Sequence, residues 1–166
     1  MCRKSCAFTG HRPKKFSWGY DETDKRCVKL KETLADQIEN LVIDGYTDFL
    51  SGMAEGVDTW AAEIVLAFRE KNPALKLHCI LPCREQADKW SDSARERFRN
   101  ILEQADSIVY VNRAYKKNCM LERNHFLVDH ADLLLAVYNG EQRGGTAATV
   151  RYATKQSKEI FTLQMG

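Results

Sequence analysis

Six short runs of β-branched and aromatic residues alternate with longer segments of helical periodicity, and this alternation restricts the fold more than any other feature of the sequence. The runs cover residues 5–10, 47–51, 76–81, 107–111, 132–138 and 159–163. The fifth run is almost continuously apolar, as expected of a strand that is covered on both faces. Strict alternation predicts an α/β fold, namely a Rossmann-like three-layer sandwich with a mostly parallel sheet of about six strands.

Apolar residues recur at helical spacing in each segment between these strands. The first helix is marked by Val28, Leu30, Leu34, Ile38, Leu41 and Val42. Gly45 follows this helix where a C-terminal cap is expected. Four further helices are predicted around residues 61–68, 94–102, 121–128 and 147–153. A chain of 166 residues without repeats or linkers is expected to form a single domain, residues 1–166.

Composition is that of a soluble globular protein, with 44% hydrophobic and 29% charged residues. No apolar run approaches the ~20 residues that a membrane span requires, and the first residues do not resemble a signal peptide. A cytoplasmic location is therefore expected, with no membrane partner. Cys79 and Cys83 beside His78 give a C-x3-C spacing, but no second Cys/His pair accompanies them. We expect reduced thiols and no metal.

Sheets of this kind bind ligands outside the carboxyl ends of their strands. The loops that should share this edge cover residues 9–15, 51–58, 82–85, 112–118 and 139–146. The first of them begins with Thr9-Gly10-His11-Arg12-Pro13. Gly10 permits a close approach of the backbone to a ligand, Arg12 offers donors suited to phosphate, and His11 can donate or accept a proton.

The second glycine-containing loop reads Ser51-Gly52-Met53-Ala54-Glu55-Gly56-Val57-Asp58 and leads into a helix. Its two glycines would let backbone amides face an anion, and the positive end of the helix dipole would add to the attraction. Asp58 either caps the helix or hydrogen-bonds a ribose hydroxyl. Trp60 either stacks on a base or belongs to the core, and the core is the commoner place for tryptophan.

A third loop, Gly144-Gly145-Thr146, opens the last helix. Thr146 is a candidate N-cap, with Thr149 three residues further on. None of the three loops matches a P-loop or the G-x-G-x-x-G fingerprint. Three such loops in one sheet nevertheless predict a binding site for a phosphate-bearing, nucleotide-type ligand.

These residues also carry a resemblance to a known family. Residues 51–58, Arg123-Asn124 and Gly144-Gly145-Thr146 resemble the motifs of the SLOG superfamily, whose Rossmann-like domains bind nucleotide-related ligands. Residues 9–13, 60–63, 89–91 and 144–153 are most similar to its YpsA-like branch. The resemblance implies a pocket lined by Gly10, Arg12, Ser51, Gly52, Gly56, Asp58, Gly145 and Thr146. Arg123 and Asn124 resemble an Arg-Asn pair in the related protein DprA, and we expect them to reach the same edge from the start of the fourth helix.

Two relatives in this superfamily imply alternative functions. LOG enzymes hydrolyse an N-glycosidic bond with a glutamate, but Thr149 stands at that position here, and Glu55, Glu63 or Glu141 would have to replace it. DprA binds single-stranded DNA, and residues 1–31 do hold nine Lys/Arg against three Asp/Glu. The rest of the chain is acidic, so nucleic-acid binding is not favoured. Exposed apolar residues on the outer helices could support a homodimer. The preferred hypothesis is binding or sensing of a nucleotide-like molecule, with no further cofactor.

Overall fold

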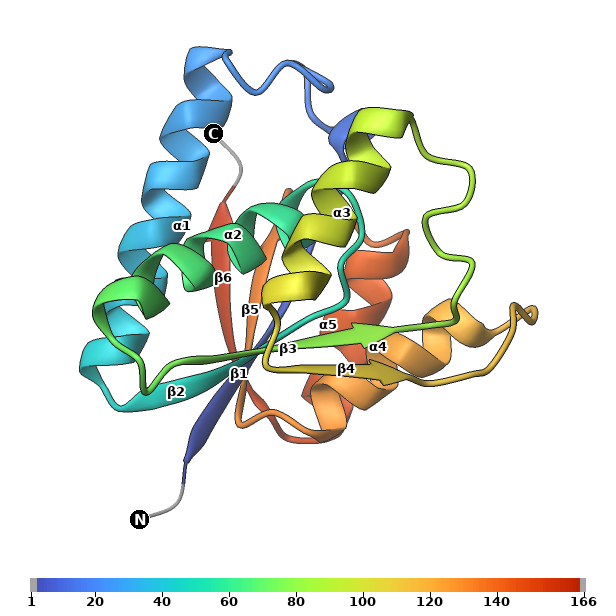
Figure 1. The fold of residues 1–166 in the computed structure, drawn as a ribbon. Helices are drawn as coiled ribbons and strands as arrows, with labels where there is room; N and C mark the ends of the chain where they lie inside the picture. Colours follow the sequence, from blue (N-terminus) through green and yellow to red (C-terminus); the bar gives the residue numbers. More distant parts are fainter. Residues whose placement is uncertain (1–2, 165–166) are drawn as a thin grey trace.

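The computed structural model describes residues 3–164, in which each of the first five strands is followed by a helix (Figure 1). The strands are β1 (Lys4–Gly10), β2 (Tyr46–Ser51), β3 (Lys76–Leu81), β4 (Ser107–Tyr110), β5 (Leu133–Tyr138) and β6 (Glu159–Gln164). The helices are α1 (Lys25–Ile43), α2 (Val57–Lys71), α3 (Asp92–Gln104), α4 (Cys119–Asp129) and α5 (Gly145–Lys155), with a 3-10 turn at Pro13–Lys15. The six predicted strands are confirmed, each to within one residue at either end.

All six strands are parallel and lie in the order β4-β3-β2-β1-β5-β6. The chain lays down β1 to β4 in one direction and then returns to place β5 on the other side of β1. The strand order therefore reverses between β1 and β5, and such a switch point is where open α/β sheets leave a crevice for a ligand. The predicted α/β class is confirmed, and the sheet is entirely rather than mostly parallel.

Alternate residues of the central strands enter two separate cores. Phe8 and Phe49 face the side covered by α1, α2 and α3, together with Trp60 of α2. Ala7 and Leu50 face the side of α4 and α5. Trp60 is only 2% exposed, so the expectation that it belongs to the core is confirmed. Both faces of the sheet are thus buried beneath helices (Figure 1).

Two helix ends illustrate how local sequence sets the boundaries. Asp44 is the C-cap of α1, and Gly45 follows it with φ 99°, a conformation that favours glycine, so the predicted glycine at the end of this helix is confirmed. The predicted N-cap of the last helix is wrong: Gly144, with φ 101°, takes the N-cap position and Thr146 is already helical. Thr149 donates its hydroxyl to Gly145 O at 2.8 Å instead of capping the helix.

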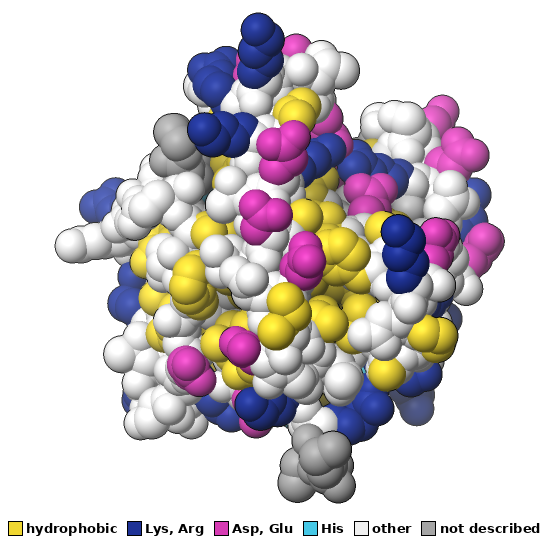
Figure 2. Space-filling model, turned by 90° about the vertical axis from the view of Figure 1, so that its left-hand side faces the viewer, with side chains coloured by type: hydrophobic (Ala, Val, Ile, Leu, Met, Phe, Trp, Pro, Cys, Tyr) yellow, Lys and Arg dark blue, Asp and Glu magenta, His cyan; other side chains and the backbone are white. Residues whose placement is uncertain are grey.

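Hydrophobic side chains also gather on the outside. Figure 2, which views the molecule from the side of α1, shows them across the middle of that face among charged groups. Ile43 at the end of α1 and Phe161 of the edge strand β6 are 74% and 42% exposed. A homodimer that covers such surface stays a prediction. No helix within residues 3–164 is both long and apolar enough to cross a membrane.

Candidate functional site

The three glycine-containing loops follow β1, β2 and β5, which are neighbours in the sheet. His11 joins them. Its backbone N–H donates to Val137 O at 3.2 Å, and its carbonyl accepts from Val57 N at 3.4 Å. Its ring Nε2 lies 3.3 Å from Asn139 Oδ1 in the third loop. The loops therefore meet at one edge, as predicted from the alternation of strands and helices, and the buried His11 holds them in place.

The loop after β2 folds around its own side chains. Ser51 Oγ donates to Asp58 O at 2.9 Å and accepts from Met53 N at 3.1 Å. Asp58 Oδ2 accepts from Ala54 N at 3.2 Å. The amides of Met53 and Ala54 are consequently occupied within the protein. In this structure they shape the loop and do not point freely at an anion.

Close contacts between loops explain two of the glycines. A Cβ on Gly10 would lie 2.5 Å from the Val57 side chain, and one on Gly56 would lie 2.7 Å from His11 O. Gly56 also has φ 91°, in the region that favours glycine. Gly145 differs, because a Cβ there would meet open space. It lies with the exposed Gly144 and the buried Thr146 and Thr149, at the start of α5.

Asp58 and Arg123 form a buried pair of charged residues beneath the second loop, 7% and 3% exposed. The Arg123 guanidinium donates to Gly52 O and, through Nε, to Asn124 Oδ1 at 2.9 Å. The predicted reach of Arg123 from α4 to this edge is thus observed. Within residues 3–164, Asp58 Oδ1 is buried without a hydrogen-bond partner.

Burial dominates the electrostatics of this pair. It raises the pKa of Asp58 to about 6, although the charge of Arg123, the Ala54 amide and the charge of Arg12 act in the opposite direction. Burial also lowers the pKa of Arg123, against the favourable charge of Asp58. The carboxyl group of Asp58 can therefore change protonation state within the physiological range.

A cavity of about 780 Å³ opens beside these loops, on the side of α2 and α3. Two of the predicted binding residues, Arg12 and Gly56, line it. The remaining lining residues are Pro13, Lys14, Tyr20, Glu22, Glu55, Thr59, Lys89, Trp90, Ser91, Ser93, Ala94, Arg97 and Phe98. Thr9, Ser51, Met53 and Asp58 are buried and do not line the cavity.

The cavity wall combines positive charge with aromatic surface. Arg12, Lys14 and Lys89 are exposed and have no ion-pair partner among the residues that the structure describes. Arg97 is different, because it binds Glu22 and Glu63 at 2.6 Å each, and these bonds raise its pKa. Trp90 is half-buried and packs edge-on against Phe98, with ring centroids 5.3 Å apart.

The comparison with known proteins confirms the resemblance seen in the sequence. The YpsA family model, described as the YspA SLOG family, matches residues 6–165. The chain belongs to the YpsA SLOG family. A UPF0398 protein of Bacillus pumilus (strain SAFR-032) is 31% identical over 153 residues, 90% of this chain and 81% of the relative. UPF0398 proteins of Bacillus cereus (strain B4264) and Bacillus thuringiensis (strain Al Hakam) are 32% identical over 158 residues, 93% of this chain and 85% of each relative.

Most of the residues that line the cavity of this YpsA SLOG family member are not predicted from the sequence as site residues. Lys89 and Trp90 belong to a segment that resembles the family, and a cation beside a tryptophan in a loop after a strand is also a signal of a ligand site. Thr59 and Phe98 carry no such signal. Their place in the wall depends on how α2 and α3 pack, which the sequence pattern does not specify.

Proposed function

We propose that this protein binds a nucleotide or nucleotide-derived ligand in the cavity at the carboxyl edge of the sheet. The observation that carries the proposal is the cavity itself, because about 780 Å³ lies within the range of small-molecule sites. The cavity lies beyond the carboxyl ends of β1, β2 and β3, and this edge of the sheet is where α/β folds bind such ligands.

The chemistry of the wall suits an anionic molecule with a planar ring. Arg12, Lys14 and Lys89 supply positive charge, and the Arg12 guanidinium can bind phosphate through two parallel hydrogen bonds. Gly56 is the N-cap of α2, and no side chain caps this end of the helix, so the helix dipole adds to the attraction. Trp90 and the 58%-exposed Tyr20 offer aromatic faces for a base.

Calorimetric titration tests this proposal with a panel of nucleoside mono- and diphosphates, NAD and ADP-ribose. At least one member should bind the wild-type protein. Arg12→Ala should weaken that binding by about 1.5–3 kcal/mol, roughly ten- to a hundred-fold, since a charged hydrogen bond is lost. Arg99→Ala removes another exposed arginine, which does not line the cavity, and should bind as wild type does.

Two results would contradict the proposal. One is the absence of binding to the wild-type protein across the whole panel. The other is equal affinity in the Arg12 and Arg99 variants, which would show that the ligand lies elsewhere.

Hydrolysis of an N-glycosidic bond in the same ligand is the second candidate, and the position of Glu55 favours it. Of the three glutamates that could replace the missing one, Glu63 is bound by Arg97 and Glu141 by Lys15. Glu55 lines the cavity. If Glu55 catalyses this hydrolysis, the protein should release free base from a bound nucleotide, and chromatography detects that base. Glu55→Gln should stop the release while leaving ligand binding intact.

A further inference from the structure

A hydrogen-bonded row of three polar side chains crosses β2, β3 and β4, away from the cavity described above. His78 Nδ1 lies 2.6 Å from Ser107 Oγ, and His78 Nε2 lies 2.8 Å from Asp48 Oδ2. His78 and Ser107 are direct partners in the register of β3 and β4. A serine, a histidine and a carboxylate are thus joined in the order that nucleophilic catalysis requires.

The carboxylate determines the position of the histidine proton. Burial alone would raise the pKa of Asp48, but hydrogen bonds from His78, Thr47 and Arg3 lower it overall. An ionised carboxylate only accepts hydrogen bonds, so His78 Nε2 carries the proton that is donated to Asp48. The lone pair of Nδ1 is then free to accept the hydroxyl proton of Ser107.

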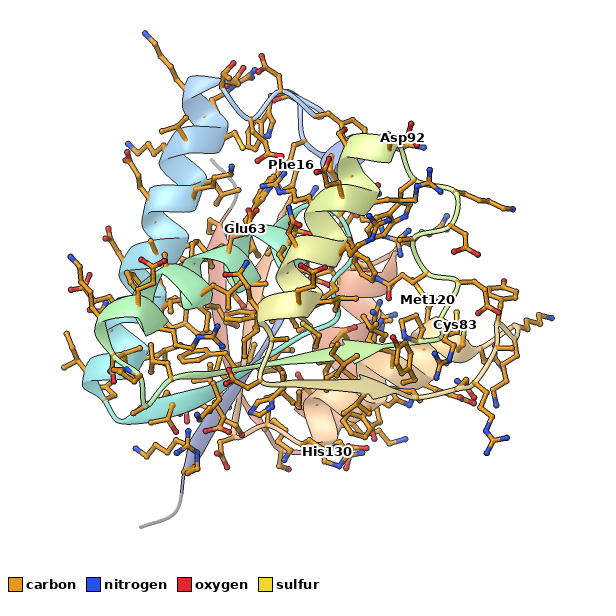
Figure 3. All side chains as sticks on the ribbon, in the orientation of Figure 1. Phe16, Glu63, Cys83, Asp92, Met120 and His130 are labelled. Atoms are coloured by element: carbon orange, nitrogen blue, oxygen red, sulfur yellow. The ribbon has the colours of Figure 1, made fainter. Side chains whose placement is uncertain are left out.

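The row opens into a hollow of about 330 Å³. Its apolar wall consists of Leu50, Ile80, Val109 and Phe126. Arg3 and His130 add polar groups, and Arg3 Nε also bonds Asp48 Oδ1 at 2.5 Å. Figure 3 shows His130 beneath the sheet, on the opposite side of the molecule from Phe16 at the carboxyl edge. The hollow is therefore separate from the proposed nucleotide site.

We propose that Ser107 is a nucleophile that accepts acyl groups from small esters with an apolar acyl chain, with His78 as its general base. Ser107 Oγ attacks the ester carbonyl carbon while its proton passes to His78 Nδ1. The bond from carbon to the leaving oxygen breaks, and that oxygen takes the proton from Nδ1 and departs as an alcohol. Water then attacks the acyl-serine through the same base and releases the acid. Asp48 is a positioning residue.

Active-site labelling with a fluorophosphonate probe provides the test. Ser107 should displace fluoride from phosphorus, and mass spectrometry of peptides from the labelled wild-type protein should place the label on Ser107. Ser107→Ala should abolish the labelling, while Ser17→Ala, which removes an exposed serine that lines neither the hollow nor the cavity, should leave it unchanged. His78→Gln should slow the labelling by about 100-fold or more, since general-base catalysis contributes on that scale.

Asp48→Asn separates catalytic positioning from a purely structural role. The side-chain amide that this substitution introduces can donate to His78 Nε2, which would leave the proton on Nδ1 and remove the base. The maximal labelling rate should then fall at least 100-fold, with little change in the probe concentration that gives half of that rate. A melting temperature measured for each variant shows that it is folded.

The rates at which the variants hydrolyse p-nitrophenyl butyrate should fall in the same order as their labelling rates. The proposal is overturned if the wild-type protein is labelled no faster than Ser107→Ala, or if the label lies on another residue. It is also overturned if His78→Gln, folded by its melting curve, reacts as fast as wild type.

Discussion

A methyl group on any of three loop glycines would overlap with a residue of a different loop or helix. The structure shows these neighbours, and the sequence alone does not. The sequence predicts ligand contacts for the glycines at 10, 52 and 56, and the structure shows that their close neighbours are Val57, Arg123 and His11. The sequence suggested a ligand as the reason for a close approach. It could not show that Arg123, 71 positions along the chain, fills the space above Gly52.

Gly52→Ala should destabilise the protein. The new Cβ would lie 2.8 Å from the guanidinium of Arg123, which is buried and cannot move away without losing its bond to Gly52 O. Overpacking of this kind costs about 1–3 kcal/mol in the free energy of unfolding, measured by urea denaturation. Gly145→Ala, where the Cβ meets open space, is the control and should change stability little. Equal stabilities of the two variants would refute the packing explanation.

Asp58 should make the free energy of unfolding fall as the pH rises, which is the reverse of the usual effect of an aspartate. Its pKa is raised by burial to about 6, against 3.8 in an unfolded chain. Between these values the folded protein holds a proton that the unfolded chain has lost, so unfolding becomes easier as pH rises. The free energy of unfolding of wild type, relative to Asp58→Asn, should fall by about 2 kcal/mol from about pH 4 to about pH 6.

Urea denaturation at several pH values measures this difference. Asp44→Asn, which alters an exposed carboxylate, should remain parallel to wild type over the same range. Parallel curves for wild type and Asp58→Asn would mean that burial does not raise the pKa of Asp58 in the folded protein.

Among the helices and strands, the positions of the strands were predicted correctly, but the predicted N-cap of α5 was wrong. The hydrophobic periodicity and the composition of the sequence locate β1 to β6, because strands that are buried on both faces need runs of apolar residues. The sequence predicts Thr146 as the N-cap of α5, whereas the structure has Gly144 in that position. Preferences for side-chain caps favour threonine, whereas the backbone at Gly144 adopts φ 101°, which favours glycine and sets the helix boundary.

Arg97 connects three elements and should control the attachment of α3. It binds Glu63 of α2 and Glu22 in the segment before α1. Arg97→Ala should increase amide hydrogen exchange in α3 and around Glu22, because the only ion pairs described for α3 with other elements are lost. Arg95→Ala removes a pair within α3, with Asp92, and should leave exchange elsewhere unchanged. Unaltered protection in the Arg97 variant would show that apolar packing alone holds α3.

At the scale of the whole molecule, strand order could not be read from the sequence. Alternation of strands and helices predicts a parallel sheet, but several orders satisfy it equally well. The return of the chain from β4 to a place beside β1 is what brings the loops after β1, β2 and β5 together. The loop after β3, the neighbour of β2, supplies Lys89 and Trp90 to the cavity wall.

Ligand binding should stabilise the whole folded chain. A nucleotide present at a hundred times its dissociation constant adds about 2.7 kcal/mol to the free energy of unfolding. For a chain of this size that corresponds to a rise of about 5–10 °C in melting temperature. Differential scanning fluorimetry should detect the rise in wild type and a much smaller one in Arg12→Ala at the same concentration. The same rise in both proteins would contradict binding through Arg12.

The hydrogen bonds of His11 have a practical consequence for protein engineering. Because this residue ties the end of β1 to Val137, Asn139 and Val57, no one of the three turns is an independent module. Grafting a single segment from a distant homologue to change specificity would break contacts that the other two segments require. Chimeras should succeed only when all three segments are exchanged as a set.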